Sequence, residues 1–251
     1  MGRRNWTRDE LILAFNLYCK TSFGRIHNRN PEIIALAKAL GRTPSSLSWK
    51  LANFARFDPA LKKRNIEGAS HGGKLEAEVW DEFFQNWEKL SFESENLRKA
   101  LLHEQVELDS REDFPDGRTR DALVRLRVNQ GFFRSAILAA YGSKCCMTGL
   151  PVAELLCASH IVPWRVDVKN RTNPRNGLCL NAFHDRAFDR GLFTITRDYK
   201  VQLSPSVRKL KDAGAKSFLH PFEGLEIKLP DRFQPNVEFL KYHAENIYRR
   251  A

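Results

Sequence analysis

The stretch that decides the fold reads Leu155-Leu-Cys-Ala-Ser-His-Ile-Val162, then Asn176-Gly-Leu-Cys-Leu180, then Asn181-Ala-Phe-His-Asp-Arg-Ala-Phe-Asp189. The first two segments are short apolar runs, which predicts two strands separated by a polar loop at 165–175. The third segment predicts a short helix that ends at Arg190-Gly191. A histidine on the first strand, an asparagine in the hairpin loop and a histidine on the helix therefore form a ββα arrangement.

The sequence on either side of this stretch completes a small domain. Cys145-Cys-Met-Thr-Gly149 predicts a tight turn before the first strand. Residues 192–196 and 200–203 predict a closing pair of strands, and a basic helix is expected from about residue 119 to 141. These elements place the ββα arrangement inside a C-terminal domain of residues 117–251.

The combined pattern resembles the signature of the HNH endonucleases, whose fold is the ββα-metal module. The residues that carry the resemblance are Ala158-Ser-His-Ile-Val-Pro-Trp164, Asn176-Gly-Leu-Cys-Leu180, His184 and Phe188-Asp-Arg-Gly191. The flanks Arg127–Arg134, Leu229–Phe233 and Tyr242-His243 also fit, so that the resemblance covers about residues 118–248. The most similar subgroup is that of bacterial restriction enzymes, which includes enzymes that cut only DNA with methylated or hydroxymethylated cytosine.

The resemblance implies a role for three residues. His160 would be the general base, and the reference pKa of histidine, about 6.5, suits that work near neutral pH. Asn176 would brace the loop that aims His160. His184 would hold a divalent metal, Mg²⁺ or Mn²⁺ or another transition ion, that stabilises the scissile phosphate and the leaving oxygen. The implied products carry 5′-phosphate and 3′-hydroxyl ends.

The chain departs from the family pattern at the metal site and in its cysteines. Many relatives have a metal-binding aspartate just before the base, where this chain has Ser159. The second metal ligand is therefore open among Ser159, Asp189 and Asn181. The five cysteines include no two Cys-x-x-Cys pairs, so buried free thiols are expected rather than a structural zinc, in a reducing cytoplasm.

Cationic side chains near the predicted centre are candidates for contacts with DNA phosphates. They are Arg165, Arg175, Arg186 and Arg190. About half of them are expected to clamp phosphates and the rest to be solvated. Asp185 is interpreted as a charge on the helix surface.

The first 58 residues predict helices and end in a helix-turn-helix pattern. Pro31–Leu40 predicts one helix, Gly41 ends it, and Ser45–Phe54 predicts the next. The side chains expected to face outward, toward the major groove of DNA, are Ser45, Ser46, Ser48, Lys50 and Asn53. A three-helix bundle with a solvated polar face remains the alternative. Trp49 is expected in the core rather than at a base-reading pocket.

The distribution of charge divides the chain into three parts. Residues 1–75 hold 14 Lys/Arg against 5 Asp/Glu, residues 76–116 hold 4 against 13, and residues 117–251 hold 23 against 12. Two basic bodies therefore flank an acidic segment, which indicates two units that face nucleic acid and a connector that avoids phosphate. The aromatic and leucine faces of the acidic helices indicate domain core or a subunit interface.

The predicted fold class is therefore α+β. A helix-turn-helix or winged-helix-like domain at residues 1–75 is followed by an acidic helical connector at 76–116 and an HNH nuclease domain at 117–251. No run of about 18 apolar residues is present, so no membrane span is expected.

The leading hypothesis is a restriction-type endonuclease that acts on double-stranded DNA, directed by sequence or by cytosine modification. Double-strand cutting by a single-centre module usually needs two copies, so a homodimer is expected. Two alternatives stay open. One is a DNA-binding regulator whose nuclease centre has decayed, with Ser159 as the first sign, and the other is a nicking or homing-type nuclease.

Overall fold

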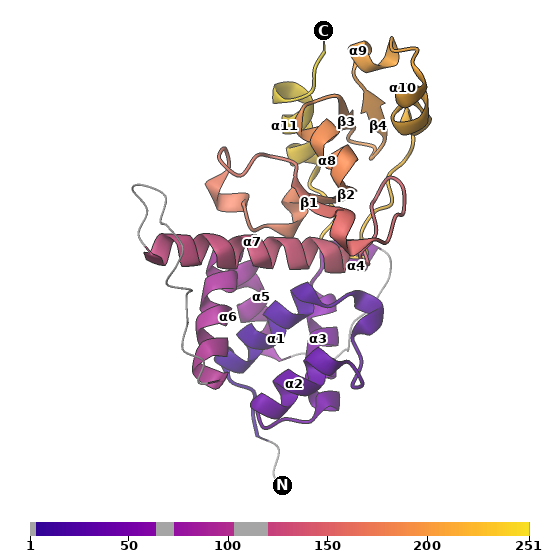
Figure 1. Ribbon diagram of the computed structural model, residues 1–251. Helices are drawn as coiled ribbons and strands as arrows, with labels where there is room; N and C mark the ends of the chain where they lie inside the picture. Colours follow the sequence, from indigo (N-terminus) through magenta and orange to yellow (C-terminus); the bar gives the residue numbers. More distant parts are fainter. Residues whose placement is uncertain (1–3, 64–72, 103–119, 251) are drawn as a thin grey trace. The chain divides into compact units, whose positions relative to one another are not determined.

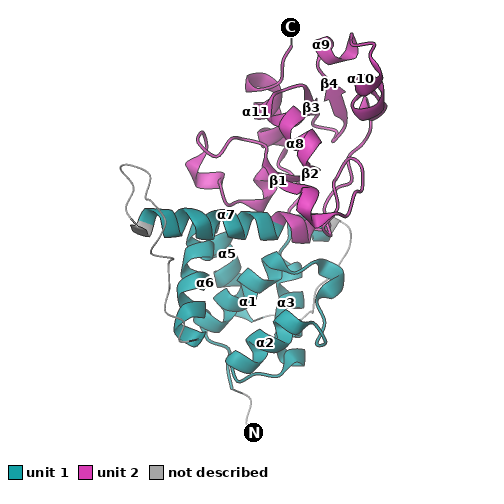
Figure 2. Ribbon diagram, viewed as in Figure 1, with its two compact units in different colours: residues 1–136 teal, residues 137–251 magenta. Residues whose placement is uncertain are grey.

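The computed structural model describes residues 4–63, 73–102 and 120–250 (Figure 1). The chain divides into two compact units, unit 1 at residues 1–136 and unit 2 at residues 137–251 (Figure 2). The predicted boundary at residue 116 lies outside the described residues. Each unit is described by itself.

Unit 1 is built from helices. They are α1 (Arg8–Lys20), the short 3₁₀ helix η1 (Phe23–Arg25), α2 (Pro31–Ala39), α3 (Pro44–Ala55), α4 (Pro59–Lys63), α5 (Lys74–Phe84), α6 (Trp87–Leu102) and α7 (Arg120–Ala140), whose end from Ile137 belongs to unit 2. The described residues of unit 1 contain no strand, so a wing of the winged-helix type is not seen in them.

Local sequence explains where the first three helices begin and end. Thr7 and Glu10 form a capping box at the start of α1, in which each side chain accepts a hydrogen bond from the other residue's backbone N–H. Asn30 and Thr43 cap α2 and α3, and a proline occupies the first position of both helices. Gly41 lies between α2 and α3 with a φ of 62°, which costs little only for glycine.

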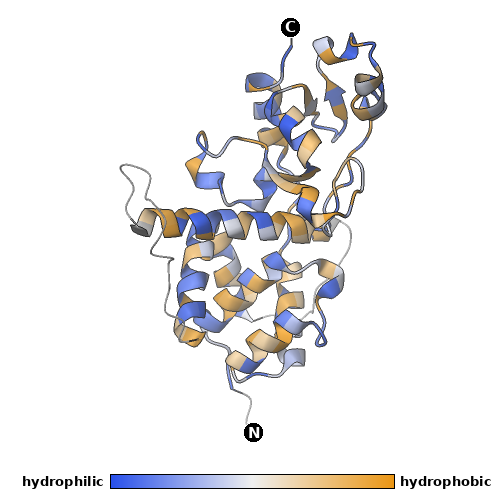
Figure 3. Ribbon diagram, viewed as in Figure 1, coloured by the Kyte–Doolittle hydropathy of each residue, from blue (hydrophilic) through white to orange (hydrophobic). Residues whose placement is uncertain are grey.

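The core of unit 1 is a cluster of aromatic side chains from four helices. Phe15 and Tyr18 of α1 pack against Phe54 of α3, Trp80 of α5 and Trp87 of α6, with ring centroids 4.9–6.4 Å apart. The acidic segment therefore contributes to this core instead of standing apart as a connector. Its helices are amphipathic, with hydrophilic and hydrophobic residues on the same helix (Figure 3). The acidic side chains of α5 and α6 are exposed or half-buried, except for Glu76, which is buried.

Unit 2 combines short strands with short helices. Its strands are β1 (Leu156–His160), β2 (Gly177–Asn181), β3 (Phe193–Ile195) and β4 (Val201–Leu203), and its helices are α8 (Ala182–Asp189), α9 (Pro205–Arg208), α10 (Ala213–Phe218) and α11 (Val237–Asn246). Single 3₁₀ turns lie at η2 (Ala153–Leu155), η3 (Val168–Asn170), η4 (Pro174–Asn176) and η5 (His220–Phe222).

The predicted strand–strand–helix arrangement is present in unit 2. β1 and β2 pair antiparallel, with Ser159 opposite Leu178 and His160 opposite Gly177. The helix α8 follows β2 directly and contacts both strands. β3 and β4 form a second antiparallel pair at the predicted position.

Gly191 marks the place where the end of α8 meets the end of α11. Its φ is 66°, and a Cβ atom built on it would lie 2.1 Å from the carbonyl oxygen of Ile247. The backbone N–H of Arg249 donates to the carbonyl of Gly191 at 3.0 Å. Only glycine satisfies both the backbone conformation and this close approach.

None of the described helices combines the length and the apolar character that crossing a bilayer requires.

Candidate active site

A pocket of about 520 Å³ opens in unit 2 beside the ββα arrangement. Its polar lining comes from three elements: Ser159 and His160 of β1, Asp185, Arg186, Asp189 and Arg190 of α8, and His243 of α11. One strand and two helices thus bring together two histidines, two carboxylates and two guanidinium groups. This combination can support acid–base chemistry and bind an anion or a cation.

His160 is held in one tautomer by the loop opposite it. Its Nε2 lies 2.8 Å from the carbonyl oxygen of Arg171, and a carbonyl only accepts, so Nε2 carries the proton and Nδ1 carries the lone pair. Burial lowers the pKa of His160, partly opposed by the hydrogen bond to Arg171 and by the charge of Asp185. The imidazole is therefore neutral at neutral pH, which is the state that a general base needs.

Asn176 ties the hairpin loop to the residues that follow His160. The Asn176 side chain is fully buried, and its Oδ1 accepts from the backbone N–H of Val162 at 2.8 Å. Its Nδ2 donates to the carbonyl of Val162 at 3.1 Å and to that of Asn170 at 3.3 Å. These bonds fix the end of β1, and with it the backbone that carries the imidazole.

Two carboxylates of α8 face the pocket together. Asp185 and Asp189 are four residues apart, so they lie on the same face of the helix. Burial raises the pKa of Asp189, and the neighbouring negative charge of Asp185 raises it further. Within the described part of the chain, no ion pair joins either carboxylate to a lysine or arginine. A cation would relieve this repulsion.

Asp185 is the functional candidate that the sequence interpretation missed, because it was taken as a surface charge. The spacing of Asp185 and Asp189 was the signal that could have identified it.

Ser159 completes the set of oxygen donors near the pocket. It is 2% exposed, and its Oγ has no hydrogen-bond partner among the described residues. A buried hydroxyl without a partner is costly, so a ligand in the pocket would stabilise it. Carboxylate and hydroxyl oxygens are donors that a hard divalent cation prefers, so the residues present fit such an ion. The described residues nevertheless contain no cluster of three or more His, Cys, Asp or Glu side chains able to hold a metal by themselves.

His184 does not face the pocket, contrary to its predicted place as the metal ligand. It is 3% exposed and lies with Ala187 and Phe188 on the buried face of α8. Its Nδ1 bonds to the amide Nδ2 of Asn181 at 3.0 Å, and its Nε2 lies 3.1 Å from the carbonyl of Phe218. With both ring nitrogens engaged in the core, His184 is a packing and hydrogen-bonding residue here.

Asn181 is also used elsewhere. As the N-cap of α8, its Oδ1 accepts from the backbone N–H of His184 at 2.9 Å, while its Nδ2 bonds to the imidazole of that residue. It is absent from the pocket lining. Neither Asn181 nor His184 is therefore placed to bind a cation beside His160.

The cysteines of unit 2 are free thiols. Cys145, Cys146 and Cys179 are buried and Cys157 is half-buried. Burial alone would raise the pKa of Cys145, but hydrogen bonds with His184 and Thr148 lower it to about 6. Burial raises the pKa of the adjacent Cys146. The turn that opens the domain is therefore tied to the buried side of α8.

The four candidate phosphate-binding arginines fall into two groups. Arg186 and Arg190 are exposed on α8 and line the pocket, next to the two carboxylates. Arg165 is exposed and Arg175 half-buried, and neither contributes to the pocket.

His243 of α11 lines the pocket and is buried. Its ring stacks on Phe188 with centroids 3.7 Å apart and planes 5° from parallel. Nε2 donates to the carbonyl of Phe188 at 3.1 Å, and Nδ1 accepts from the hydroxyl of Thr194 at 2.9 Å. Burial lowers the pKa of His243 to about 4, so the ring is neutral and joins α11 to the end of α8.

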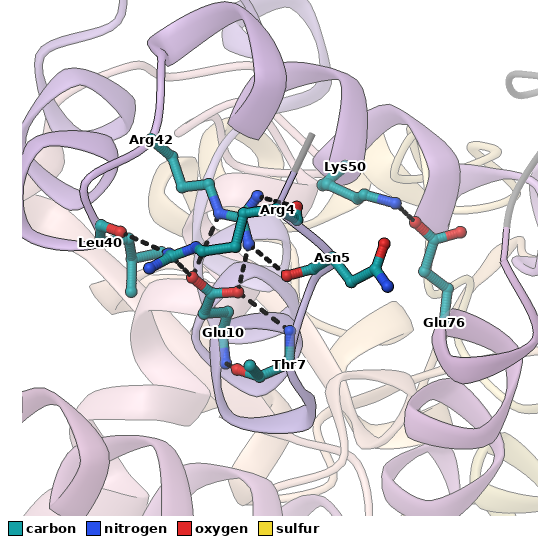
Figure 4. Close-up of polar contacts among 8 residues, drawn as sticks. All are labelled: Arg4, Asn5, Thr7, Glu10, Leu40, Arg42, Lys50 and Glu76. Atoms are coloured by element: carbon teal, nitrogen blue, oxygen red, sulfur yellow. Dashed lines mark hydrogen bonds and ion pairs between the residues drawn. The ribbon is translucent and has the colours of Figure 1, made fainter. Parts of the chain in front are cut away.

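The predicted DNA-reading residues of α3 in unit 1 also divide into two groups. Ser45 is exposed, and Ser46 and Ser48 are half-buried. Lys50 and Asn53 instead turn inward, where both contact the carboxylate of Glu76, which is 1% exposed. Figure 4 shows the pairing of Lys50 with Glu76. The outward prediction was wrong for Lys50 and Asn53 because α5 covers that side of α3 and supplies a buried acid.

A second ion network holds the turn between α2 and α3 to the start of α1. Arg42 pairs with Glu10 through two hydrogen bonds of 2.7 and 3.2 Å, and Arg4 pairs with the same carboxylate (Figure 4). Burial acts to raise the pKa of Glu10, but the bonds from Arg42 and Thr7 lower it below its usual value. Arg42, whose side chain is 9% exposed, therefore stabilises unit 1 and is not open to a phosphate, whereas the Arg4 side chain stays 62% exposed.

Trp49 lies on the side of α3 opposite to the core. It is 65% exposed, whereas Leu47 and Leu51 on the inner side are fully buried. The expectation that Trp49 packs in the core is therefore wrong, because its position in the helix points it away from the other helices.

Comparison with known proteins gives one family. Residues 145–196 match the model of the HNH endonuclease family, and no curated protein matches the chain. The matched range begins at the Cys145 turn and ends just after β3, so it contains β1, β2 and α8 with the pocket residues that they carry. A nuclease domain implies DNA as the substrate. Residues 145–196 are therefore similar to an HNH endonuclease domain, and this similarity supports nuclease activity in general.

Proposed function

We propose that this chain is a metal-dependent DNA endonuclease in which unit 2 cuts the duplex and unit 1 selects the site. The observation that carries the proposal is the pocket in which the neutral imidazole of His160 faces the carboxylates of Asp185 and Asp189. Hydrolysis of a phosphodiester needs a base for the attacking water and positive charge at the phosphate, and this pocket supports both.

His160 is the general base. The lone pair on Nδ1 takes a proton from water, the water oxygen attacks phosphorus, and the bond from phosphorus to the 3′ oxygen breaks. The products are a 5′-phosphate and, once the leaving oxygen takes up a proton, a 3′-hydroxyl. The carbonyl of Arg171 keeps the imidazole oriented during this transfer, and Asn176 keeps β1 and the loop in register. General-base catalysis of this kind contributes about 10²–10⁴-fold to the rate.

Asp185 and Asp189 are the residues that would hold the divalent cation, with Ser159 beside them. A bound Mg²⁺ or Mn²⁺ would supply positive charge at the scissile phosphate. Such ions are commonly bound through one or two carboxylates plus phosphate oxygens and water, which agrees with a site that lacks a complete cage of protein ligands. This assignment replaces His184 and Asn181 in the metal site.

Arg186 and Arg190 bind phosphate groups next to the scissile bond. Both are exposed, and both line the pocket. Guanidinium groups bind phosphate through paired N–H donors, so they hold the strand without taking part in the proton transfer. Arg165 and Arg175, which lie outside the pocket, are assigned to contacts along the flanking backbone.

The biological role proposed is restriction of double-stranded DNA, directed by sequence or by 5-methylcytosine or 5-hydroxymethylcytosine. The exposed face of α3 in unit 1 is the surface assigned to site selection. Because the pocket supplies one base and one candidate cation site, cutting of both strands is assigned to a homodimer.

The test uses purified full-length chain and supercoiled plasmids, unmodified or carrying 5-methylcytosine or 5-hydroxymethylcytosine, with Mg²⁺, Mn²⁺ or EDTA. We expect metal-dependent cleavage, lost in His160→Ala and Asp185→Asn. The matched control is Asp198→Asn, which removes an exposed carboxylate outside the pocket and should leave cleavage unchanged.

Two outcomes would favour the other candidates. DNA binding without cleavage of any substrate by the wild-type chain would indicate a regulator with a decayed centre. Conversion of supercoiled plasmid to open circle alone would indicate a nicking enzyme. Equal cleavage by the wild type and His160→Ala would show that the general base is misassigned.

A further inference from the structure

The exposed face of α3 consists of one large aromatic side chain among small ones. Trp49 is 65% exposed, the largest exposed fraction among the exposed large apolar side chains of the described residues. Its neighbours one turn away are Ser45 and Ala52, and Ser48 precedes it. The indole is therefore mostly exposed, with small side chains at these three neighbouring positions.

Charge around α3 favours a polyanionic partner. Residues 22–57 contain six Lys/Arg and a single Asp/Glu. Lys50 and Arg42 are used in the ion networks of unit 1, but Arg25 and Arg29 are exposed on the segment between α1 and α2. That segment is attached to α3, because Asn28 Nδ2 donates to Ser45 Oγ at 3.1 Å. An exposed tryptophan is thus flanked by cations suited to phosphate groups.

The arrangement of α2 and α3 indicates what kind of contact Trp49 can make. In a helix-turn-helix unit, the N-terminal part of the second helix lies in the major groove of DNA. The major groove displays the C5-methyl group of thymine, and apolar side chains recognise that group by direct contact. A methyl group on C5 of cytosine projects from the same position of a pyrimidine ring into the same groove.

We propose that Trp49 contacts the C5-methyl group of a pyrimidine in the major groove, and so makes unit 1 a reader of methyl-bearing duplex DNA. The proposal rests on the DNA substrate of the proposed function. It specifies the chemistry that unit 1 reads: a methyl group on thymine or on 5-methylcytosine. Ser45 and the two exposed arginines position the duplex, while Trp49 supplies the methyl contact.

The experiment uses four pools of random 30-base-pair duplexes that differ only at C5 of the pyrimidines. One pool holds cytosine and thymine, one 5-methylcytosine and thymine, one cytosine and uracil, and one 5-methylcytosine and uracil. Binding of the full-length chain is measured by competition in EDTA, so that cleavage does not interfere. The cytosine–uracil pool lacks every C5-methyl group, and the two mixed pools separate thymine from 5-methylcytosine as the source.

We expect the wild-type chain to bind at least one methyl-bearing pool about fivefold more tightly than the cytosine–uracil pool. Trp49→Ser should abolish this difference. Ile34→Ser removes another exposed apolar side chain, on α2 rather than α3, and should retain it. Circular dichroism of each variant verifies that unit 1 is folded, which is expected because the Trp49 side chain is 65% exposed.

A second readout follows the indole itself. The fluorescence of Trp49, obtained as the difference between wild type and Trp49→Phe, should become less accessible to acrylamide when the preferred pool is bound. Equal affinity of the wild type for all four pools, or an undiminished preference in Trp49→Ser, would overturn the proposal. Unchanged accessibility of the Trp49 fluorescence to acrylamide when the preferred pool is added would also overturn the proposal.

These outcomes are separate from those of the nuclease test. Methyl-dependent binding through Trp49 in a chain that never cuts would retain the inference and reject the nuclease. Plasmid cleavage together with methyl-independent binding would retain the nuclease and reject the inference about Trp49.

Discussion

The helices α3 and α8 were both expected to carry functional side chains, and the structure divides the side chains of each helix between a buried side and an open side. In α3, Lys50 and Asn53 turn inward, where Lys50 forms an ion pair with the carboxylate of Glu76 and Asn53 donates a hydrogen bond to it. In α8, His184 turns inward, while Asp185 and Asp189 face an open pocket, and no ion pair joins either carboxylate to a lysine or arginine among the described residues.

The difference between the two helices separates stability from function. Polar groups of α3 that found a protein partner contribute to the fold of unit 1. Asp189 of α8 instead lies in a pocket and has a raised pKa, and such groups are candidates for a functional site. The side of a helix that a polar residue occupies therefore says more about its role than its residue type does.

The largest effect is expected on the open side of α8. Asp185→Asn should lower the cleavage rate by about 10³-fold, because transition-state charge at the phosphate would lose several kcal/mol of stabilisation. The unfolding midpoint in urea should stay the same or rise, since a carboxylate repulsion disappears. Single-turnover cleavage and urea denaturation of the same preparation measure the two quantities. A large loss of stability would place Asp185 with the structural residues of α8 and break the comparison.

The buried side of α8 should respond in the opposite way. His184→Ala leaves the carbonyl of Phe218 and the amide of Asn181 without their buried partner, and it opens a cavity beside Phe222. We expect unit 2 to lose about 2–4 kcal/mol of unfolding free energy. Under conditions where the variant is folded, the Mg²⁺ concentration for half-maximal cleavage should not change. A shift of that concentration by tenfold would return His184 to the metal site.

In α3, the two inward-facing side chains Lys50 and Asn53 share one partner, the carboxylate of Glu76. Glu76→Ala leaves Lys50 and Asn53 without their common partner, so the free energy of unfolding of unit 1 should fall by about 2–3 kcal/mol. Glu78→Ala is the matched control, because the Glu78 side chain is 55% exposed and its pairing with Lys74 spans 3.7 Å at the surface. Chemical denaturation followed by tryptophan fluorescence compares the two. Equal losses of unfolding free energy in the two variants would mean that the burial of Glu76 does not strengthen its contribution to stability.

The smallest effect concerns acid stability of unit 1. The pKa of Glu10 is lowered in the folded state, so the stabilisation it gives is present above the unfolded pKa, about 4.3, and is lost as pH falls through the folded pKa. Glu10→Gln should therefore reduce stability by about 1 kcal/mol at pH 7 and by less at pH 3. Thermal denaturation of both proteins across this range measures the difference. A constant difference at every pH would show that packing, not charge, is responsible.

Much of unit 2 could be predicted from local sequence. The apolar runs before Pro163 and after Asn176 specify β1 and β2, and Gly191 specifies the end of α8, since each signal acts within a few residues. The face on which His184 lies depends on Phe218 and Phe222, which are more than thirty residues away. Local sequence therefore could not indicate that His184 is buried, although the four-residue spacing of Asp185 and Asp189 was visible in the sequence.

In unit 1, the packing of the acidic segment also depends on residues far away in the sequence, so local sequence did not predict it. Its net negative charge predicted a connector, but the charge says nothing about the aromatic face formed by Trp80, Phe83 and Trp87, which packs on α1. The expectation that this face belongs to a domain core or an interface was closer. Glu76, the buried acid that redirects Lys50 and Asn53, could not be recognised before α5 was placed against α3.

The contact at Gly191 has a consequence for mutational scanning of this protein. Any other residue there must displace the backbone at Ile247 and adopt a left-handed conformation, so every substitution should score as a loss of activity. In a screen read only by survival or cleavage, Gly191 would then be indistinguishable from His160. Pairing the screen with a measurement of abundance would separate them, since Gly191 variants should be depleted from the cell while His160 variants accumulate as intact, inactive protein.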